Sequence, residues 1–157
     1  MTAHEKRALY DEMAAQLTAL LSGESDPIAN AANTAAVIYH GLPDLNWAGF
    51  YFRRDDGLVL GPFQGKPACV RIPWGQGVCG TAAARGTAVI VPDVDQFPGH
   101  IACDPNSRAE LVVPLVKAGE VTGVLDIDSP VLARFDEEDR AGVERLVAIL
   151  IASLGPE

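Results

Sequence analysis

The chain has 157 residues, of which 48% are hydrophobic and 21% charged, and this globular composition excludes an intrinsically disordered protein. Its 12 Lys and Arg oppose 21 Asp and Glu for a net charge of −9, without a basic stripe, so nucleic acid is not an expected partner. The longest apolar stretch, residues 146–154, is half the ~18 residues needed to cross a bilayer, and the sequence does not begin with a signal-peptide pattern. We therefore expect a cytoplasmic protein of one domain that does not associate with membranes.

The first 41 residues favour two helices. Thr2 followed by Glu5 has the spacing of a capping box, and apolar residues then recur at helical intervals, which predicts a helix over about residues 3–22. Asp26 and Pro27 form an N-cap and N1 pair, and they predict a second helix that runs to Gly41.

A hairpin follows, with an aromatic-rich strand at 47–54, a turn at 55–57 and a return at 58–60. Trp47 and Tyr51 are four residues apart and therefore project from one face of the strand, whereas Ala48, Phe50 and Phe52 project from the other. The two rings form either the wall of a ligand pocket or part of a core, and the pattern does not choose between these interpretations.

The middle of the chain predicts short strands at 68–72 and 88–91 on either side of a small-residue helix at 77–85. Residues 92–109 have no periodic pattern and predict a long loop, a kind of segment that is often functional.

Strands at 110–116 and 121–128 then flank a turn at 117–120, with Pro114 indicating an edge or a bulge. Asp136 caps a last helix, whose inward face carries Val143, Leu146, Val147, Leu150 and Leu154. This order predicts an α+β fold, a central antiparallel sheet with helices gathered on one face.

The three cysteines, an odd number, do not form a structural disulfide framework. Cys103 lies in the long loop three residues from His100, whose imidazolium would favour the thiolate. Cys79 begins the short helix, where the partial positive charge lowers a thiol pKa, so it is either reactive or a small buried packing residue. Cys69 lies on or beside a strand. The three thiols with His100 lack a close Cys-x-x-Cys pair, so we expect no metal.

An acidic group forms the other candidate site. Alternation directs Asp126 and Asp128 to one face at the end of an apolar strand, and Glu110 opens the neighbouring strand. Acids at strand ends are often simply solvated. If these carboxyls are desolvated instead, their pKa values rise, which suits a proton donor or a site for a ligand ammonium.

Short segments of characteristic sequence occur at residues 65–69, 77–80, 93–94, 97–104 and 107–115. They closely resemble the free methionine-(R)-sulfoxide reductases, which are enzymes built on a single GAF domain, and the resemblance extends over nearly the whole chain. It implies one GAF domain over residues 1–157, with the terminal helices on one face of the sheet and a ligand pocket under loops on the other.

The resemblance also implies roles for single residues. Cys103 matches the nucleophile of the family and Cys69 its resolving partner, whereas the role at Cys79 stays open. Residues expected at the substrate are Glu110, Asp126, Asp128, Trp47 and Tyr51. The implied reaction reduces free methionine-(R)-sulfoxide without a cofactor, through a sulfenic acid and a disulfide that thioredoxin or a similar dithiol reduces.

The carboxylates predict specificity for a free amino acid, because one ionised carboxylate pairs with its α-ammonium. Long terminal helices, with Ile149 and Ile151 outside the inward stripe of the last one, predict a homodimer. Two alternatives stay open at this point: a non-catalytic GAF module that binds a small ligand or dimerises, and a zinc-stabilised interaction domain.

Overall fold

The computed structural model describes residues 1–101 and 104–155, so the predictions for Cys103 lie outside the described residues. Its helices and strands are α1 (Ala3–Leu21), α2 (Pro27–Gly41), β1 (Trp47–Arg54), β2 (Gly57–Gly65), β3 (Arg71–Pro73), α3 (Gly77–Arg85), β4 (Val89–Val91), the 3₁₀ turn η1 (Val94–Gln96), β5 (Ala109–Lys117), β6 (Glu120–Ser129) and α4 (Glu137–Ser153). All strand pairs are antiparallel, in the order β3-β2-β1-β6-β5-β4. The fold is therefore α+β, as the sequence predicted.

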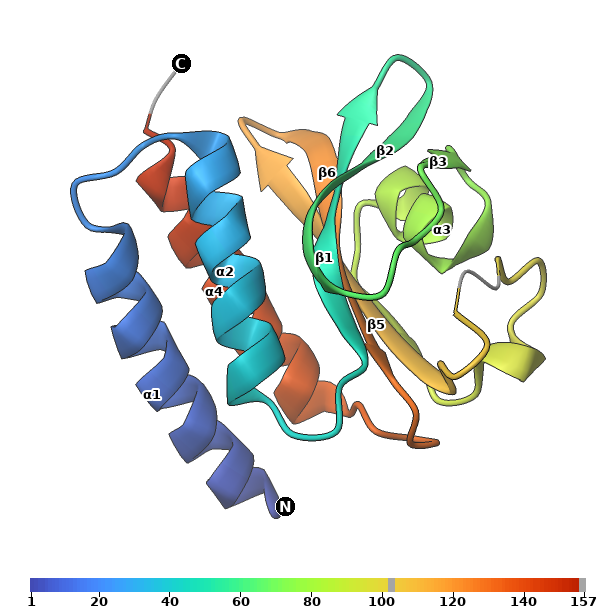
Figure 1. Ribbon diagram of the computed structural model, residues 1–157, viewed down its shortest axis with the longest axis horizontal. Helices are drawn as coiled ribbons and strands as arrows, with labels where there is room; N and C mark the ends of the chain where they lie inside the picture. Colours follow the sequence, from blue (N-terminus) through green and yellow to red (C-terminus); the bar gives the residue numbers. More distant parts are fainter. Residues whose placement is uncertain (102–103, 156–157) are drawn as a thin grey trace.

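The elements form three layers (Figure 1). Helices α2 and α4 cover one face of the sheet, with α1 packed on the outside of these two helices, and α3 lies on the other face with the loops around it. Within the described part of the chain, no helix is long and apolar enough to span a membrane.

The caps that the sequence predicted are present. Thr2 and Glu5 exchange two hydrogen bonds of 3.1 Å at the start of α1, and Asp26 accepts from the amide of Ala29 at the start of α2. Asp136 caps α4 by accepting from the amides of Glu138 and Asp139. Local polar residues thus fix where the three covering helices begin.

Alternation along the central strands divides the core in two. Phe50, Leu111 and Ile127 pack against the helices, whereas Tyr51 and Val112 pack on the side of α3. The two faces predicted for the first strand are confirmed, and the face toward α3 is the one that carries the polar residues described below.

The expectation of a strand at 68–72 is wrong in its bounds, because only Arg71–Pro73 forms β3. The preceding strand β2 runs to Gly65, five residues beyond the expected end. Residues 66–69 instead leave the sheet as a loop whose carbonyls at Lys66 and Cys69 accept hydrogen bonds from side chains of β1. These side-chain contacts replace the strand ladder.

Pro114 lies in β5, which is an inner strand of the sheet and not an edge. However, β4 pairs only with residues 110–112 of β5, so Pro114 lies beyond the end of that neighbour. A register shift between Leu115 and Val116 follows directly. The proline is tolerated because the sheet is locally unpaired on that side.

A buried ionic group joins α1 to α4. Lys6 Nζ lies 2.6 Å from Asp139 Oδ2, the Tyr10 hydroxyl donates to Oδ1 at 2.8 Å, and Arg134 approaches to 3.4 Å. Gly142 permits this contact, since a Cβ there would collide with the ring of Tyr10. On the same helix, Ile149 and Ile151 are half-buried against the core.

Candidate active site

A cavity of about 50 Å³ lies between the sheet and α3. Its polar and aromatic lining comes from three strands, one helix and one loop: Trp47, Tyr51, Glu110, Asp126, Asp128, Cys79 and His100. Ile101 and Asp104, on either side of positions 102 and 103, line it as well, and so does Ala68 beside Cys69. The structure thus brings together most of the residues that the sequence singled out.

Strand register explains why three carboxyl groups meet. Glu110 of β5 pairs directly with Asp128 of β6, and Asp128 also lies opposite Trp47 of β1. Asp126, two residues away on the same face, lies opposite Gly49. Glu110, Asp126 and Asp128 are 6%, 7% and 9% exposed, so the interpretation of these acids as solvated strand ends is wrong.

Burial, followed by the neighbouring carboxyls, raises the pKa of both Asp126 and Asp128 well above the ordinary range. Asp126 Oδ1 is buried without a hydrogen-bond partner among the described residues. Among the described residues, no Lys or Arg forms an ion pair with either of these two carboxylates. The pocket is therefore suited to hold a proton or to receive a cationic ligand.

His100 supplies the one imidazole in the lining. Its Nε2 lies 3.5 Å from Glu110 Oε1, and the hydrogen bond with Glu110 raises the pKa of His100 against the opposing effect of burial. The sequence suggested this histidine as an activator of Cys103. Its contact in the described structure is with a carboxylate of the pocket.

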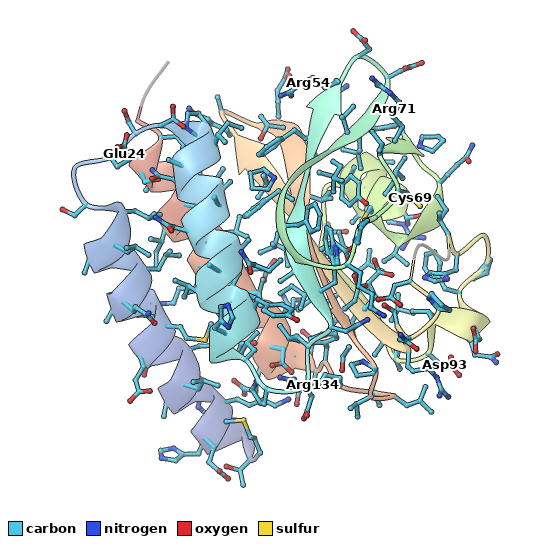
Figure 2. The ribbon with its side chains drawn as sticks, viewed as in Figure 1. Glu24, Arg54, Cys69, Arg71, Asp93 and Arg134 are labelled. Carbon is cyan, nitrogen blue, oxygen red and sulfur yellow. The ribbon has the colours of Figure 1, made fainter. Side chains whose placement is uncertain are left out.

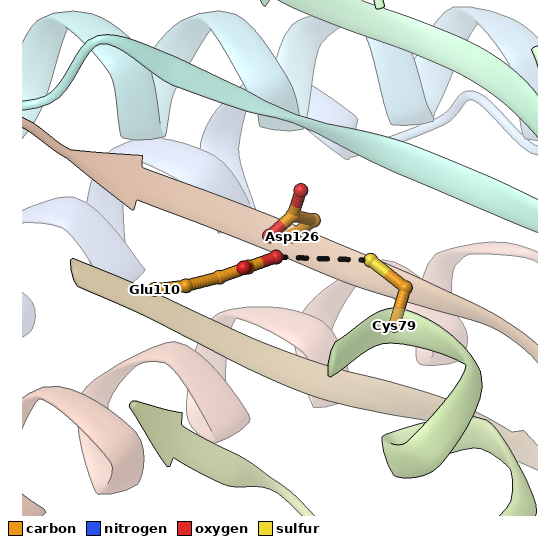
Figure 3. Close-up of side chains that lie close together, drawn as sticks. All are labelled: Cys79, Glu110 and Asp126. Carbon is orange, nitrogen blue, oxygen red and sulfur yellow. Dashed lines mark hydrogen bonds between the residues drawn. The ribbon is translucent and has the colours of Figure 1, made fainter. Parts of the chain in front are cut away.

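Cys79 lies in the first turn of α3 and is 3% exposed, with its Sγ 4.0 Å from Glu110 Oε2 (Figure 3). Burial raises the pKa of the Cys79 thiol, and the carboxyls of Asp126 and Glu110 raise it further. The expectation that the helix start lowers this pKa is wrong, because desolvation and nearby acids outweigh the partial charge of the helix. The other interpretation, a small buried packing residue, agrees with its place in the core of this face.

The aromatic residues of β1 serve as core and pocket wall at once. Trp47 and Tyr51 are 3% and 2% exposed, and Trp47 stacks on Tyr51 and on Phe63 at centroid distances of 6.0 and 5.2 Å. Gly49 lies between them, and a Cβ at this position would collide with Phe63.

Both aromatic residues also anchor the loop that carries Cys69. Trp47 Nε1 donates to the carbonyl of Lys66 at 3.0 Å, and the Tyr51 hydroxyl donates to that of Cys69 at 2.8 Å. Figure 2 shows Cys69 on the side of the sheet that carries α3. In this structure Cys69 does not carry a free thiol.

Asn46 holds three residues of the pocket lining in place, a role that the sequence did not reveal. Its side-chain Nδ2 donates to Asp104 Oδ2 at 3.1 Å and to Ser107 Oγ at 3.0 Å, and its backbone N–H donates to the backbone carbonyl of Asp128 at 3.0 Å. One asparagine thereby ties the long loop to the acidic end of β6. No spacing or motif marks it, since its side-chain partners are 58 and 61 residues away and Asp128 is farther still.

Comparison with known proteins agrees with this arrangement. The GAF domain family model matches residues 26–154. The free methionine-R-sulfoxide reductases of Escherichia coli and Saccharomyces cerevisiae are 54% and 39% identical over 92% of this chain, covering 88% and 85% of their own lengths. The structure of free methionine-R-sulfoxide reductase from Neisseria meningitidis in complex with its substrate is 49% identical, with a TM-score of 0.91 over 94% of this chain and 89% of that one.

The chain therefore belongs to the GAF domain family. Within that family it is a member of the free methionine-R-sulfoxide reductases, which are oxidoreductases.

Proposed function

We propose that this protein reduces free methionine-(R)-sulfoxide to methionine. The observation that carries the proposal is the meeting of Glu110, Asp126 and Asp128 in a buried pocket walled by Trp47, in a chain whose relatives are named for this reaction. Neutral small molecules do not require three buried acids, whereas an amino acid presents an ammonium to them.

The acidic group supplies two different functions. One ionised carboxylate pairs with the α-ammonium of the substrate, and a carboxyl with a raised pKa keeps its proton near neutral pH. That proton assists departure of the sulfoxide oxygen, which is a poor leaving group until it is protonated. Trp47 and Tyr51 offer an apolar wall for the side chain of the substrate.

Thiol chemistry completes the reaction. The Cys103 thiolate attacks at the sulfoxide, the oxygen passes from the methionine sulfur to Cys103 as the pocket carboxyl supplies a proton, and methionine leaves with Cys103 as a sulfenic acid. The Cys69 thiol condenses with it, releases water and forms a Cys69–Cys103 disulfide. Thioredoxin or a similar dithiol then returns both cysteines to thiols and is itself oxidised to a disulfide.

Cys79 is not the nucleophile in this proposal. The raised pKa of its buried thiol keeps the sulfur protonated, and a thiol reacts far more slowly than a thiolate. Its place in the first turn of α3 instead keeps the helix close to Glu110.

A coupled assay with thioredoxin, thioredoxin reductase and free methionine-(R)-sulfoxide tests the function. Cys103→Ser should abolish turnover, and Cys69→Ser should release about one methionine per site without cycling under thioredoxin. Near-normal methionine release by Cys103→Ser, with loss in Cys79→Ser, would move the nucleophile to Cys79. Unimpaired cycling by Cys69→Ser would remove its role as the resolving cysteine.

We further propose that the enzyme is one domain, works in the cytoplasm and forms a homodimer through its terminal helices. The apolar side chain of Leu20, 46% exposed on α1, supports the dimer. Light scattering that finds a monomer at micromolar concentration would remove it.

A further inference from the structure

Three potential metal ligands converge on the floor of the pocket. Cys79 Sγ from α3, a carboxylate oxygen of Glu110 from β5 and one of Asp126 from β6 all lie within 4.8 Å of one another (Figure 3). All three residues are more than nine-tenths buried, and each comes from a separate element of the rigid core. This set differs from the zinc set of three cysteines and His100 that the sequence spacing argued against.

The distances suit a small tetrahedral ion. With Zn–S and Zn–O bonds of about 2.3 and 2.1 Å, sulfur and oxygen on one ion are about 3.6 Å apart. The Cys79 Sγ to Glu110 Oε2 distance is 4.0 Å, so a shift of a few tenths of an ångström brings this pair into coordination. The other two ligand pairs lie within 4.8 Å, so the three side chains are gathered before an ion binds and close further around it.

Two further observations support a metal ion at these three residues. Asp126 Oδ1 is buried and accepts no hydrogen bond among the described residues, so it has an unused lone pair in the pocket. The second oxygen of Glu110 lies 3.5 Å from His100 Nε2, a contact from outside the ligand set that holds a coordinating carboxylate in place.

We propose that Cys79, Glu110 and Asp126 form a zinc site that blocks the substrate pocket. A thiolate among the ligands favours zinc over magnesium or calcium, which prefer oxygen alone. As the Zn–S bond forms, the thiol proton passes to solvent and the sulfur is not oxidised. With three protein ligands, one coordination position remains for water.

The consequence for activity rests on the proposed function. The ion occupies two carboxylates that otherwise serve the ammonium and the sulfoxide oxygen of the substrate. Zinc is therefore a reversible inhibitor, and chelation restores the enzyme.

The test uses Co²⁺ in place of Zn²⁺ as the probe. The protein is the full-length variant Cys69→Ser/Cys103→Ser, in which Cys79 is the remaining thiol. We expect one ion per chain and a sulfur-to-cobalt charge-transfer band in the near ultraviolet. On that background Cys79→Ser should lose the band, and Asp126→Asn should weaken binding by at least about tenfold. Asp128→Asn, an acid of the same pocket outside the ligand set, should weaken it by no more than about threefold.

The outcomes separate this proposal from the enzymatic one, because the probe protein does not turn over. A missing band, or a band that survives Cys79→Ser, overturns the metal site even if the wild type reduces the sulfoxide. Glu110→Gln is a second ligand variant in case Asp126→Asn does not fold. If free methionine-(R)-sulfoxide fails to displace the bound cobalt, the ion does not block the substrate pocket.

Discussion

Two groups of buried carboxylates lie on opposite sides of the sheet, and their surroundings differ completely. Asp139, 1% exposed between α4 and α1, faces Lys6 at 2.6 Å, Arg134 at 3.4 Å and the hydroxyl of Tyr10. Asp126 and Asp128 face other carboxyls and a thiol, and the basic residue among the described residues that line their pocket is His100, beside Glu110.

The difference shows how one fold uses the same side chain for two purposes. Burial alone lowers the pKa of Lys6, but hydrogen bonds to Asp139 and Asp136 outweigh it and raise that pKa, so the ion pair persists. Among the described residues no Lys or Arg pairs with Asp126 or Asp128, and burial raises the pKa of both carboxyls instead. A compensated group joins two helices, whereas an uncompensated one is prepared for a ligand that brings the missing charge.

The largest effect is expected when the substrate lacks the α-ammonium that pairs with the pocket carboxylates. Methionine-(R)-sulfoxide with its α-amine acetylated and its carboxyl amidated has no ammonium, which leaves a buried carboxylate unpaired at a cost of about 3 to 5 kcal/mol. We expect kcat/KM to fall by about two to four orders of magnitude relative to the free amino acid. Comparable kcat/KM for the two substrates would refute the pairing of carboxylate and ammonium.

The second effect breaks the compensated group. Asp139→Asn leaves Lys6 and Arg134 without their shared anion, and we expect the free energy of unfolding to fall by about 3 kcal/mol. Chemical denaturation measures it, and the folded fraction should keep its activity. Asp11→Asn is the matched control, because the exposed Asp11–Arg145 pair also joins α1 to α4 and should contribute less than about 1 kcal/mol. Equal losses in the two variants would contradict the distinction.

The third effect has the opposite sign. The folded-state pKa of Asp126 lies above its unfolded value near 3.8, so ionisation costs stability as pH rises above that value. Asp126→Asn should therefore raise the free energy of unfolding by about 1 to 2 kcal/mol at pH 7.5 while activity is lost. The gain should shrink as pH falls toward about 3, where wild-type Asp126 is mostly protonated in both states. A variant that is less stable than wild type at both pH values would show that Asp126 is compensated after all.

Much of the fold and part of the candidate site could be predicted from the sequence, because strand alternation and helix capping depend on residues close together in the chain. Alternation placed Trp47 with Tyr51 on one face of their strand and Asp126 with Asp128 on one face of theirs, because strand geometry is local. The pairing of β1 with β6 then brings both pairs to the same side of the sheet. The capping residues Thr2, Asp26 and Asp136 likewise fixed the helix starts through neighbours three residues away or fewer.

Features that depend on distant segments were not readable. The pKa of Cys79 depends on the packing of α3 over β5 and β6, and Asn46 meets partners from the long loop. The loop at 66–69 was expected to belong to a strand, because its anchors on Trp47 and Tyr51 are hydrogen bonds from another strand. The burial that turns three strand-end acids into a candidate site therefore had to come from the structure.

The smallest effect concerns His100, the basic residue among the described residues that line the pocket. Its contact with Glu110 raises its folded pKa above 6.5, so its contribution to stability is fully present below that pH and is lost as pH rises through the raised value. We expect His100→Gln to lower the free energy of unfolding by no more than about 1 kcal/mol at pH 5.5 and by less at pH 9. His40→Gln, at an exposed histidine, is the control. A loss that grows toward pH 9 would mean that neutral His100 makes the stabilising contact, and the pocket acids would then have no cationic neighbour of any kind among the described residues.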